Sequence, residues 1–306
     1  MTSVSKYNLL KQKVAETVFE SDRCLTQLDI EKELANRYFY PKKQTKQAIK
    51  ALVAEQTLTY TYKYGHTFLE KSFNKPVRIS KRVVIKPPGI AYRPEAGDLV
   101  IEILHGASFG NGEHPTTRLA IRGVEYALSS DRFLRDEQNT FALDIGTGSG
   151  VLAITAVLFG INRAIGIDID PVARSEAKKN VSLNKLSNRI SVHNLSLDDI
   201  NRQFSLIIAN LRYPTLKKLY SLLDLITEQQ AAVVLSGLKT SEMPDVQKLY
   251  TQKFFKLGRK EVEKGWGAMV FEKTDYRDLS NLYLEALEKD SFQGPRDNVS
   301  LFAVKL

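Results

Sequence analysis

The 306-residue sequence contains a single cysteine, Cys24. One cysteine cannot form an internal disulfide, and it cannot build a cysteine-based metal site. This usage is typical of a protein from a reducing compartment, and we expect no metal site.

Long hydrophobic runs are also missing. No stretch approaches the roughly 18 apolar residues that a membrane helix needs, and residues 1–20 lack the apolar region of a secretory leader. We therefore expect a cytoplasmic protein that makes no membrane contact. Hydrophobic residues make up 43% of the chain and charged residues 26%, shares that are typical of a packed globular protein of one or two domains.

Basic charge is concentrated in the first third of the chain. Residues 1–90 contain 17 Lys and Arg against 8 Asp and Glu, whereas residues 91–306 contain 27 of each kind. Such an excess suits a partner that carries phosphate or an acidic protein surface, and it also suits an ordinary solvated surface. Charge alone leaves both interpretations open.

The N-terminal residues predict three helices followed by a β-hairpin. Apolar residues recur at helical spacing from Leu9 to Val18 and again after the possible N-cap Thr26, and a third helix is expected from Pro41. Lys42, Lys46 and Lys50 fall four residues apart on that third helix. Residues 58–70 alternate in the manner of a hairpin that turns at a glycine. This order resembles a winged helix-turn-helix, so we predict a basic winged-helix-like domain over 1–75.

The rest of the chain predicts an α/β fold. Apolar runs at 83–85 and 99–104, separated by Pro and Gly, indicate strands of a connecting segment over 76–130. From 141 onward strand-like runs alternate with helical patterns, which indicates a parallel sheet covered by helices on both faces. We assign 131–306 to this domain, including a C-terminal extension with a helix at about 279–287 and a strand at about 299–304.

A glycine-rich turn is the strongest local motif. In FALDIGTGSGVLAITA an apolar strand runs into Gly146, Gly148 and Gly150 and then into an apolar helix. Such glycines let a ligand approach the backbone near a helix N-terminus, although purely structural turns share the pattern. Val151 stands where a dinucleotide fingerprint would need glycine, and no Walker-type lysine follows, so nicotinamide and triphosphate cofactors are disfavoured.

Three aspartates accompany this turn. Asp168 ends the next strand about twenty residues downstream, where a carboxylate can accept hydrogen bonds from ribose hydroxyls. Asp170 precedes Pro171 and is assigned to the N-cap of the following helix. Asp144 either meets the amino group of a cofactor or only organises the loop.

Four motifs occur in a fixed order: FGNGEHPTTRLAI at 109–121, LDIGTGSGVLAI at 143–154, GIDIDPVA at 166–173 and IIANL at 207–211. Together with SGL at 236–238 and GWGAMVF at 265–271 they resemble the PrmA family, which methylates large-subunit ribosomal protein eleven. The resemblance covers about residues 80–273. It implies a class I methyltransferase dependent on S-adenosylmethionine (SAM), with a Rossmann-like, seven-stranded, mostly parallel sheet and SAM as cofactor.

The resemblance also implies roles for individual residues. It puts Phe109, Gly110, Thr116 and Thr117 over the methionine end of the cofactor. It also puts Asn210 at the carboxyl edge of the sheet, as a cofactor-binding residue whose amide could orient a nucleophile. The alternatives are structural: a loop followed by a capped helix from about Arg118, with His114 also structural, and a strand-end turn stabilised by the asparagine.

This chain departs from the family pattern in two ways. Asn111 and Glu113 replace two threonines of the usual FGTGTHPTT, and the basic N-terminal region replaces a ferredoxin-like module. With Asn210 and Glu113 as the groups that hold the acceptor, the first hypothesis is methylation of a protein amine. The second is methylation of RNA or another nucleic acid held by residues 1–75, and the third is a SAM-sensing DNA-binding regulator.

Overall fold

The computed structural model describes residues 3–273 except for 22, 64, 105, 107, 130–138 and 253–254. The helix and strand predicted after residue 275 lie outside these residues. No helix within the described ranges is long and apolar enough to cross a bilayer.

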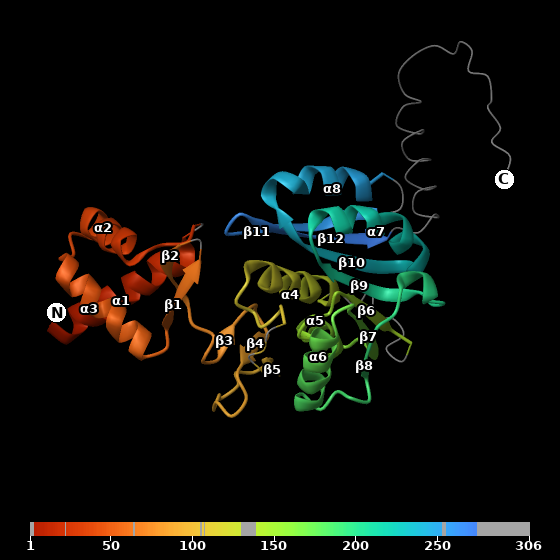
Figure 1. Ribbon diagram of the computed structural model, residues 1–306, viewed down its shortest axis with the longest axis horizontal. Helices are drawn as coiled ribbons and strands as arrows, with labels where there is room; N and C mark the ends of the chain where they lie inside the picture. The colour runs from red at the N-terminus through yellow and green to blue at the C-terminus, as the bar shows by residue number, and fades with distance from the viewer. Residues whose placement is uncertain are drawn as a thin grey trace, which may run out of the picture. The chain divides into compact units, whose positions relative to one another are not determined.

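The N-terminal region consists of three helices and a hairpin (Figure 1). Helices α1 (Ser3–Glu20), α2 (Gln27–Tyr38) and α3 (Lys42–Ala54) precede the antiparallel strands β1 (Leu58–Lys63) and β2 (His66–Lys71). The predicted elements are confirmed, except that Pro41 is the N-cap of α3 and lies outside its first turn. The winged-helix assignment and the three domain boundaries stay predictions.

Local chemistry explains how this region forms. The Thr26 hydroxyl accepts a hydrogen bond from the amide of Asp29, and the Asp29 carboxylate accepts one from the amide of Thr26, which together form a capping box at α2. Leu25 pairs with Leu69 of β2 and so attaches the α1–α2 connection to the hairpin. Eleven buried apolar side chains form a core for this region alone: Leu10, Val14, Val18, Leu25, Ile30, Leu34, Ala48, Ile49, Leu52, Leu58 and Leu69.

A small sheet follows, made of β3 (Val77–Arg78), β4 (Val83–Lys86) and β5 (Leu99–Glu102), with β4 parallel to β5. The predicted strand of 99–104 is shorter, because pairing with β4 ends at Glu102. Four buried side chains of this sheet, Val77, Val83, Ile85 and Ile101, belong to the same core cluster as one face of the main sheet.

The main sheet has seven strands in the order β11-β12-β10-β9-β6-β7-β8. Five are parallel: β6 (Phe141–Ile145), β7 (Arg163–Ile167), β8 (Ile190–His193), β9 (Phe204–Asn210) and β10 (Thr227–Lys239). The hairpin of β11 (Phe255–Glu263) and β12 (Trp266–Lys273) adds two strands, and β12 runs antiparallel to both of its neighbours. The predicted seven-stranded, mostly parallel α/β sheet is therefore confirmed.

Helices cover both faces of this sheet (Figure 1). One face carries α4 (Pro115–Leu128), α5 (Val151–Leu158) and α6 (Pro171–Leu183), and the other carries α7 (Tyr213–Ile226) and α8 (Met243–Tyr250). Strand β9 shows why both faces are apolar: Leu206 and Ile208 belong to the first core cluster, whereas Ile207 belongs to the second. Side chains alternate along a strand, so a run of apolar residues fills both layers.

The order of connections places a site. From β6 the chain winds outward through β7 and β8, then returns to the other side of β6 with β9. In open α/β sheets such a reversal leaves a crevice at the carboxyl ends of the strands, where ligands bind. The motifs at 146–150, 168 and 210 all lie at this edge.

Candidate functional site

The glycine-rich turn joins the end of β6 to α5. The amides of Gly146 and Thr147 donate to the carbonyl oxygen of Ile167 at the end of β7, at 2.8 and 3.0 Å. Gly148 has φ +53, and a Cβ there would lie 2.5 Å from the Phe109 carbonyl oxygen. Position 148 therefore requires glycine for both its conformation and its contacts.

The segment around Phe109 lies against this turn. The Ser149 amide donates to the Phe109 carbonyl at 2.9 Å, and the Ser149 hydroxyl donates to the Gly110 carbonyl at 2.8 Å. Asn180, buried on α6, donates from Nδ2 to the Ser149 carbonyl and accepts from the Leu104 amide at Oδ1. The structure thus brings the motif at 109–121 against the glycine-rich turn, nearly forty residues away in the sequence. Phe109 and Gly110 each make this contact through their backbone carbonyl oxygens.

Asp144 is fully buried at the end of β6. Its Oδ2 accepts from the Thr147 hydroxyl at 2.7 Å and from the Ala153 amide at 3.2 Å, while Oδ1 has no partner among the described residues. Burial raises the pKa of this carboxyl to about 6; its two hydrogen bonds oppose the rise, and the nearby charge of Asp168 adds to it. One oxygen organises the loop, and the other is left for a donor.

Asp168 and Asp170 differ as expected in their surroundings. The Asp168 carboxylate accepts from the amides of Gly148 and Asp170, at 3.0 and 2.9 Å, which fixes it beside the glycine turn. Asp170 accepts from the Val172 amide and is the N-cap of α6, with Pro171 in the first turn, so the predicted cap is confirmed.

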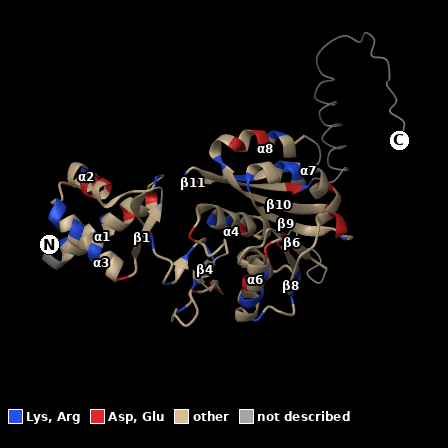
Figure 2. Cartoon of the chain, viewed as in Figure 1, with Lys and Arg blue, Asp and Glu red and all other residues tan. Residues whose placement is uncertain are grey.

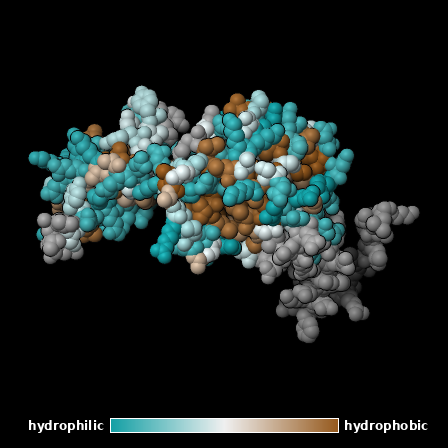
Figure 3. Space-filling view, turned by 90° about the horizontal axis from the view of Figure 1, so that it is seen from below, coloured by the Kyte–Doolittle hydropathy of each residue, from teal (hydrophilic) through white to brown (hydrophobic). Residues whose placement is uncertain are grey.

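Apolar side chains flank these carboxylates. Ile169 is 90% exposed, which is unusual for isoleucine, and Val172 and Phe109 are half exposed. Figure 3 shows apolar residues gathered on the face of the α/β part that is seen from below. Sequence reasoning passed over Ile169, because an apolar residue next to a strand is normally assigned to the core.

Helix α4 begins earlier than one of the sequence-based alternatives proposed. His114 is the N-cap, and its Nδ1 accepts from the Thr116 amide; the helix starts at Pro115, so a start at about Arg118 capped by threonine is wrong. Proline fixes the φ of the first turn and so brings Thr116 and Thr117 inside the helix. Both threonines are buried, and the Thr117 hydroxyl has no partner within the described residues.

Asn210 is the last residue of β9 and lies opposite Ser236 of β10. The Ser236 hydroxyl donates to the Thr116 carbonyl at 2.8 Å, and the Ser236 backbone carbonyl accepts from the Leu211 amide at 3.1 Å. These bonds connect the Asn210 strand end to the start of α4. The Asn210 side chain is half-buried and has no hydrogen bond to the residues that the structure describes.

Glu113 lies at the rim, with an exposed side chain. Its backbone is held firmly, because its amide donates to Asn111 Oδ1 and its carbonyl accepts from Arg118 Nη1 at 2.6 Å. Arg118 also pairs with Glu263. The structure therefore anchors the loop and leaves the Glu113 carboxylate without a hydrogen bond in the described part of the chain.

Three rings border this loop. The centroids of Phe109 and His114 lie 5.1 Å apart, and those of His114 and Trp266 lie 4.9 Å apart with the rings edge to face. Trp266 is the sole tryptophan in the chain and begins β12, far from the other two in sequence. Only the GWGAMVF motif could have pointed to it, and the motif carried no role for the ring.

The residues fit a nucleoside cofactor with an amino acid end. Buried oxygens without partners, Asp144 Oδ1, Thr117 Oγ1 and Ser108 Oγ, are groups that a polar ligand would satisfy. The described ranges contain no cluster of three or more His, Cys, Asp or Glu side chains arranged to hold a metal.

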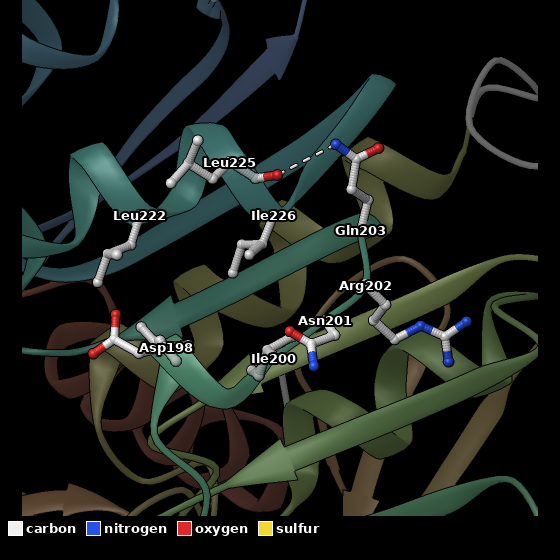
Figure 4. Close-up of a pocket in the computed structure, with 9 residues that line it drawn as sticks. Asp198, Ile200, Asn201, Arg202, Gln203, Leu222, Leu225 and Ile226 are labelled. Carbon is white, nitrogen blue, oxygen red and sulfur yellow. Dashed lines mark hydrogen bonds between the residues drawn. The ribbon is translucent and has the colours of Figure 1, made fainter.

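A separate pocket lies at the opposite edge of the sheet (Figure 4). It is lined by residues before β9, including Ile200 and Arg202, and by the end of α7, where Gln203 Nε2 donates to the Leu225 carbonyl at 3.2 Å. Arg202 is also stacked over the Phe141 ring at the amino end of β6. This pocket is thus distinct from the edge that carries the motifs.

Comparison with known proteins bears on this arrangement. The model of the family described as "Ribosomal protein L11 methyltransferase (PrmA)" matches residues 11–274. The chain belongs to this family. Proteins named ribosomal protein L11 methyltransferase are 34% identical to it over 201 residues in Heliobacterium modesticaldum and over 203 residues in Geobacter sp. (strain M21). Each alignment covers 65% of this chain, and the chain spans 61% and 64% of those relatives.

A solved PrmA structure is also similar. The crystal structure of ribosomal protein L11 methylase from Lactobacillus delbrueckii subsp. bulgaricus is 28% identical, with a TM-score of 0.58 over 66% of this chain and all of that chain. The predicted class I methyltransferase fold is confirmed. The PrmA match places the ordered motifs within one family, and the contacts described above show that they converge at one edge of the sheet.

Proposed function

We propose that this PrmA-family chain is a SAM-dependent methyltransferase that modifies a protein amine, with ribosomal protein L11 as the first acceptor to test. The observation that carries this proposal is the pairing of Asp144 and Asp168 around the glycine turn. One carboxyl is buried with an unpartnered oxygen, and the other is held by two backbone amides. The names of the similar proteins support the same acceptor.

We assign the cofactor contacts as follows. The Asp168 carboxylate would accept hydrogen bonds from the ribose hydroxyls, while the exposed Ile169 beside it would cover an apolar face of the base. Asp144 Oδ1 and the Thr117 hydroxyl would meet polar groups toward the methionine end. The remaining contacts are assigned to Phe109, Gly110, Thr116, Gly146, Gly148 and Gly150.

When bound, SAM supplies a methyl group that leaves its sulfonium for an acceptor nitrogen, and S-adenosylhomocysteine is the second product. The chain's own contribution would be alignment and exclusion of water. Asn210, at the strand end with a free amide group in the described structure, would orient the acceptor amine. Glu113 at the rim would attract the amine while it is still protonated, and the amine would release that proton to solvent before its neutral nitrogen accepts the methyl group. The rings of His114 and Trp266 would pack against the apolar stem of the acceptor.

Methyl transfer from tritiated SAM to purified ribosomal protein L11 tests the proposal. Asn210→Ala should bind SAM within about threefold of the parent and lose roughly 100-fold in turnover, the size of effect expected when a reacting group is misaligned. Asn201→Ala, at an exposed site on the opposite edge, is the matched control and should retain full turnover. Full turnover by Asn210→Ala would remove this assignment.

The acceptor class is tested separately with fractionated cell extract. Label that is lost on protease treatment supports a protein acceptor, whereas label lost on nuclease treatment supports the alternative of a nucleic-acid acceptor. Binding of SAM without transfer to any fraction would support the third hypothesis, a SAM-sensing regulator. A ribosomal acceptor would also place the protein in the cytoplasm.

We retain the division of the chain into three domains, 1–75, 76–130 and 131–306, as part of the proposal.

A further inference from the structure

The outer face of α3 is covered by lysines. Its inner face enters the core of the N-terminal region through Ala48, Ile49 and Leu52, and Thr45 is buried with them. Apart from Ala54 at its last position, the exposed residues of the helix are all cationic or amide: Lys42, Lys43, Gln44, Lys46, Gln47 and Lys50.

These lysines are not balanced by nearby acids. Residues 34–54 contain five Lys and Arg and no Asp or Glu. In the described structure Lys11 of α1 pairs with Glu55 and Lys13 pairs with Glu16, but the lysines of α3 form no ion pair. Figure 2 shows this separation, with blue on α3 and red on α2.

The spacing of these charges works against the helix. Lys42, Lys46 and Lys50 are four residues apart, and like charges at that spacing destabilise a helix by about 0.2–0.5 kcal/mol per pair. A polyanionic partner would reverse the sign of this contribution. The arrangement is therefore better explained by a partner than by solubility alone.

An exposed aromatic residue extends the same surface. Phe39 occupies the turn between α2 and α3, in the left-handed conformation with φ 59, and is 88% exposed. It lies three residues before Lys42. Because a fully exposed phenylalanine contributes nothing to the core, it offers apolar contact area at the end of the lysine face.

We propose that α3 is a docking surface for double-helical DNA, with the helix in the major groove. That groove is about 12 Å wide and accepts an α-helix of about 10–12 Å with its side chains, whereas the major groove of A-form RNA is too narrow. The lysines would contact phosphates on either side. Gln44 and Gln47 would face the base edges, where glutamine pairs with adenine, and Phe39 would contact a thymine methyl group.

An acidic protein would satisfy the charge but not the rest of the surface. The centres of protein–protein interfaces are depleted in lysine and enriched in apolar anchors, and the exposed side of α3 has the opposite composition. This inference concerns residues 37–54 and does not depend on the proposed methyl transfer.

The inference is tested by fluorescence anisotropy, which measures the affinity of the full chain for a labelled DNA duplex of about 20 base pairs at several salt concentrations. Each phosphate contact contributes about 0.9 to the magnitude of the slope of log affinity against log salt concentration. The triple variant Lys42→Gln, Lys46→Gln and Lys50→Gln should lower that slope by about 3 and weaken binding at least roughly tenfold at about 100 mM salt. The fold should survive, since these side chains are exposed and uncharged glutamine removes their mutual repulsion. Circular dichroism and the melting temperature check this.

The matched control removes the same charge elsewhere. Lys178→Gln, Lys179→Gln and Lys218→Gln change three exposed lysines of α6 and α7, and binding should stay within about twofold of the parent, since general charge effects are small at this ionic strength. Four outcomes would overturn the proposal. The two triple variants could weaken binding equally, or the affinity could be independent of salt. The protein could bind duplex RNA more tightly than duplex DNA, or polyglutamate could compete as effectively as unlabelled DNA.

Discussion

Replacement of Asp144 by asparagine should stabilise the fold and weaken cofactor binding at the same time. The carboxyl is fully buried, and its pKa is raised to about 6 from an ordinary value near 4. A difference of about two units corresponds to roughly 3 kcal/mol between the protonated and ionised forms. Above pH 6 the folded protein keeps a buried carboxylate that is stabilised by two hydrogen bonds and destabilised by desolvation.

The sign follows from proton linkage. Between pH 4 and 6 the folded state binds more protons at Asp144 than the unfolded state, so stability falls as pH rises through this window and stays low above it. Asparagine has no such dependence. Its oxygen can still accept from Thr147 and Ala153, but its amino group takes the unpartnered position of Oδ1, which costs about 1–2 kcal/mol.

Asp144→Asn should therefore be about 1–2 kcal/mol more stable than the parent at pH 8 and equally or less stable at pH 4. Urea unfolding at both pH values measures the difference. SAM affinity by calorimetry should fall about 10- to 100-fold, the usual effect of losing a hydrogen bond to a charged group. A stability difference that is the same at pH 4 and pH 8 would refute the reasoning, because it would mean that the buried carboxyl does not titrate as described.

Three further predictions test the site and its frame. Gly148→Ala should lower the free energy of unfolding by more than Gly265→Ala does, because both positions have positive φ but only a Cβ at 148 would face a backbone oxygen at 2.5 Å. Gly148→Ala should also abolish the heat of SAM binding, and similar melting temperatures for the two variants would contradict this reasoning. Glu263→Gln should destabilise the protein at neutral pH, because two arginines lower the Glu263 pKa by more than burial raises it and hold it below the ordinary value of 4.5. The stabilisation from the ionised carboxylate is lost as pH falls from 4.5 through this lower folded pKa, so variant and parent should converge in acid; unfolding curves at pH 3.5 and 7 decide. Asp168→Ala should weaken SAM binding about 10- to 100-fold with an unchanged fold, whereas Asp170→Ala should lower helix stability by about 1 kcal/mol with little effect on SAM; calorimetry and melting curves separate the two.

The sequence predicted the parallel sheet well because its evidence is local. Apolar runs such as that of β9 and the cap formed by Asp170 with Pro171 each depend on a few adjacent residues. The hairpin of β11 and β12 and helix α8 were not predicted, since these elements depart from the alternation that identified the others. The glycine turn was likewise found from adjacent residues, since FALDIGTGSGVLAITA runs from an apolar strand through three glycines into an apolar helix.

The site was predicted only in part, because several of its contacts join distant segments. Asn180 looks like any polar residue of a surface helix until its two backbone partners are known. His114 was expected more often as a structural residue than as a chemical one, and the structure makes it the cap of α4 and the middle ring of three. The pairing of His114 with Trp266 depends on β12 folding back beside β10, which no local pattern encodes.

The asparagines of α6 have a consequence for how this protein can diverge. Asn184 binds both the amide and the carbonyl of Glu102, in the manner of a neighbouring strand. Asn180, one turn earlier, accepts from the Leu104 amide and donates to the Ser149 carbonyl. Because those bonds reach main-chain atoms, they require no particular side chain at 102 or 104, whereas replacing either asparagine would remove them. An insertion between 102 and 109 would be tolerated only if it left that backbone register intact.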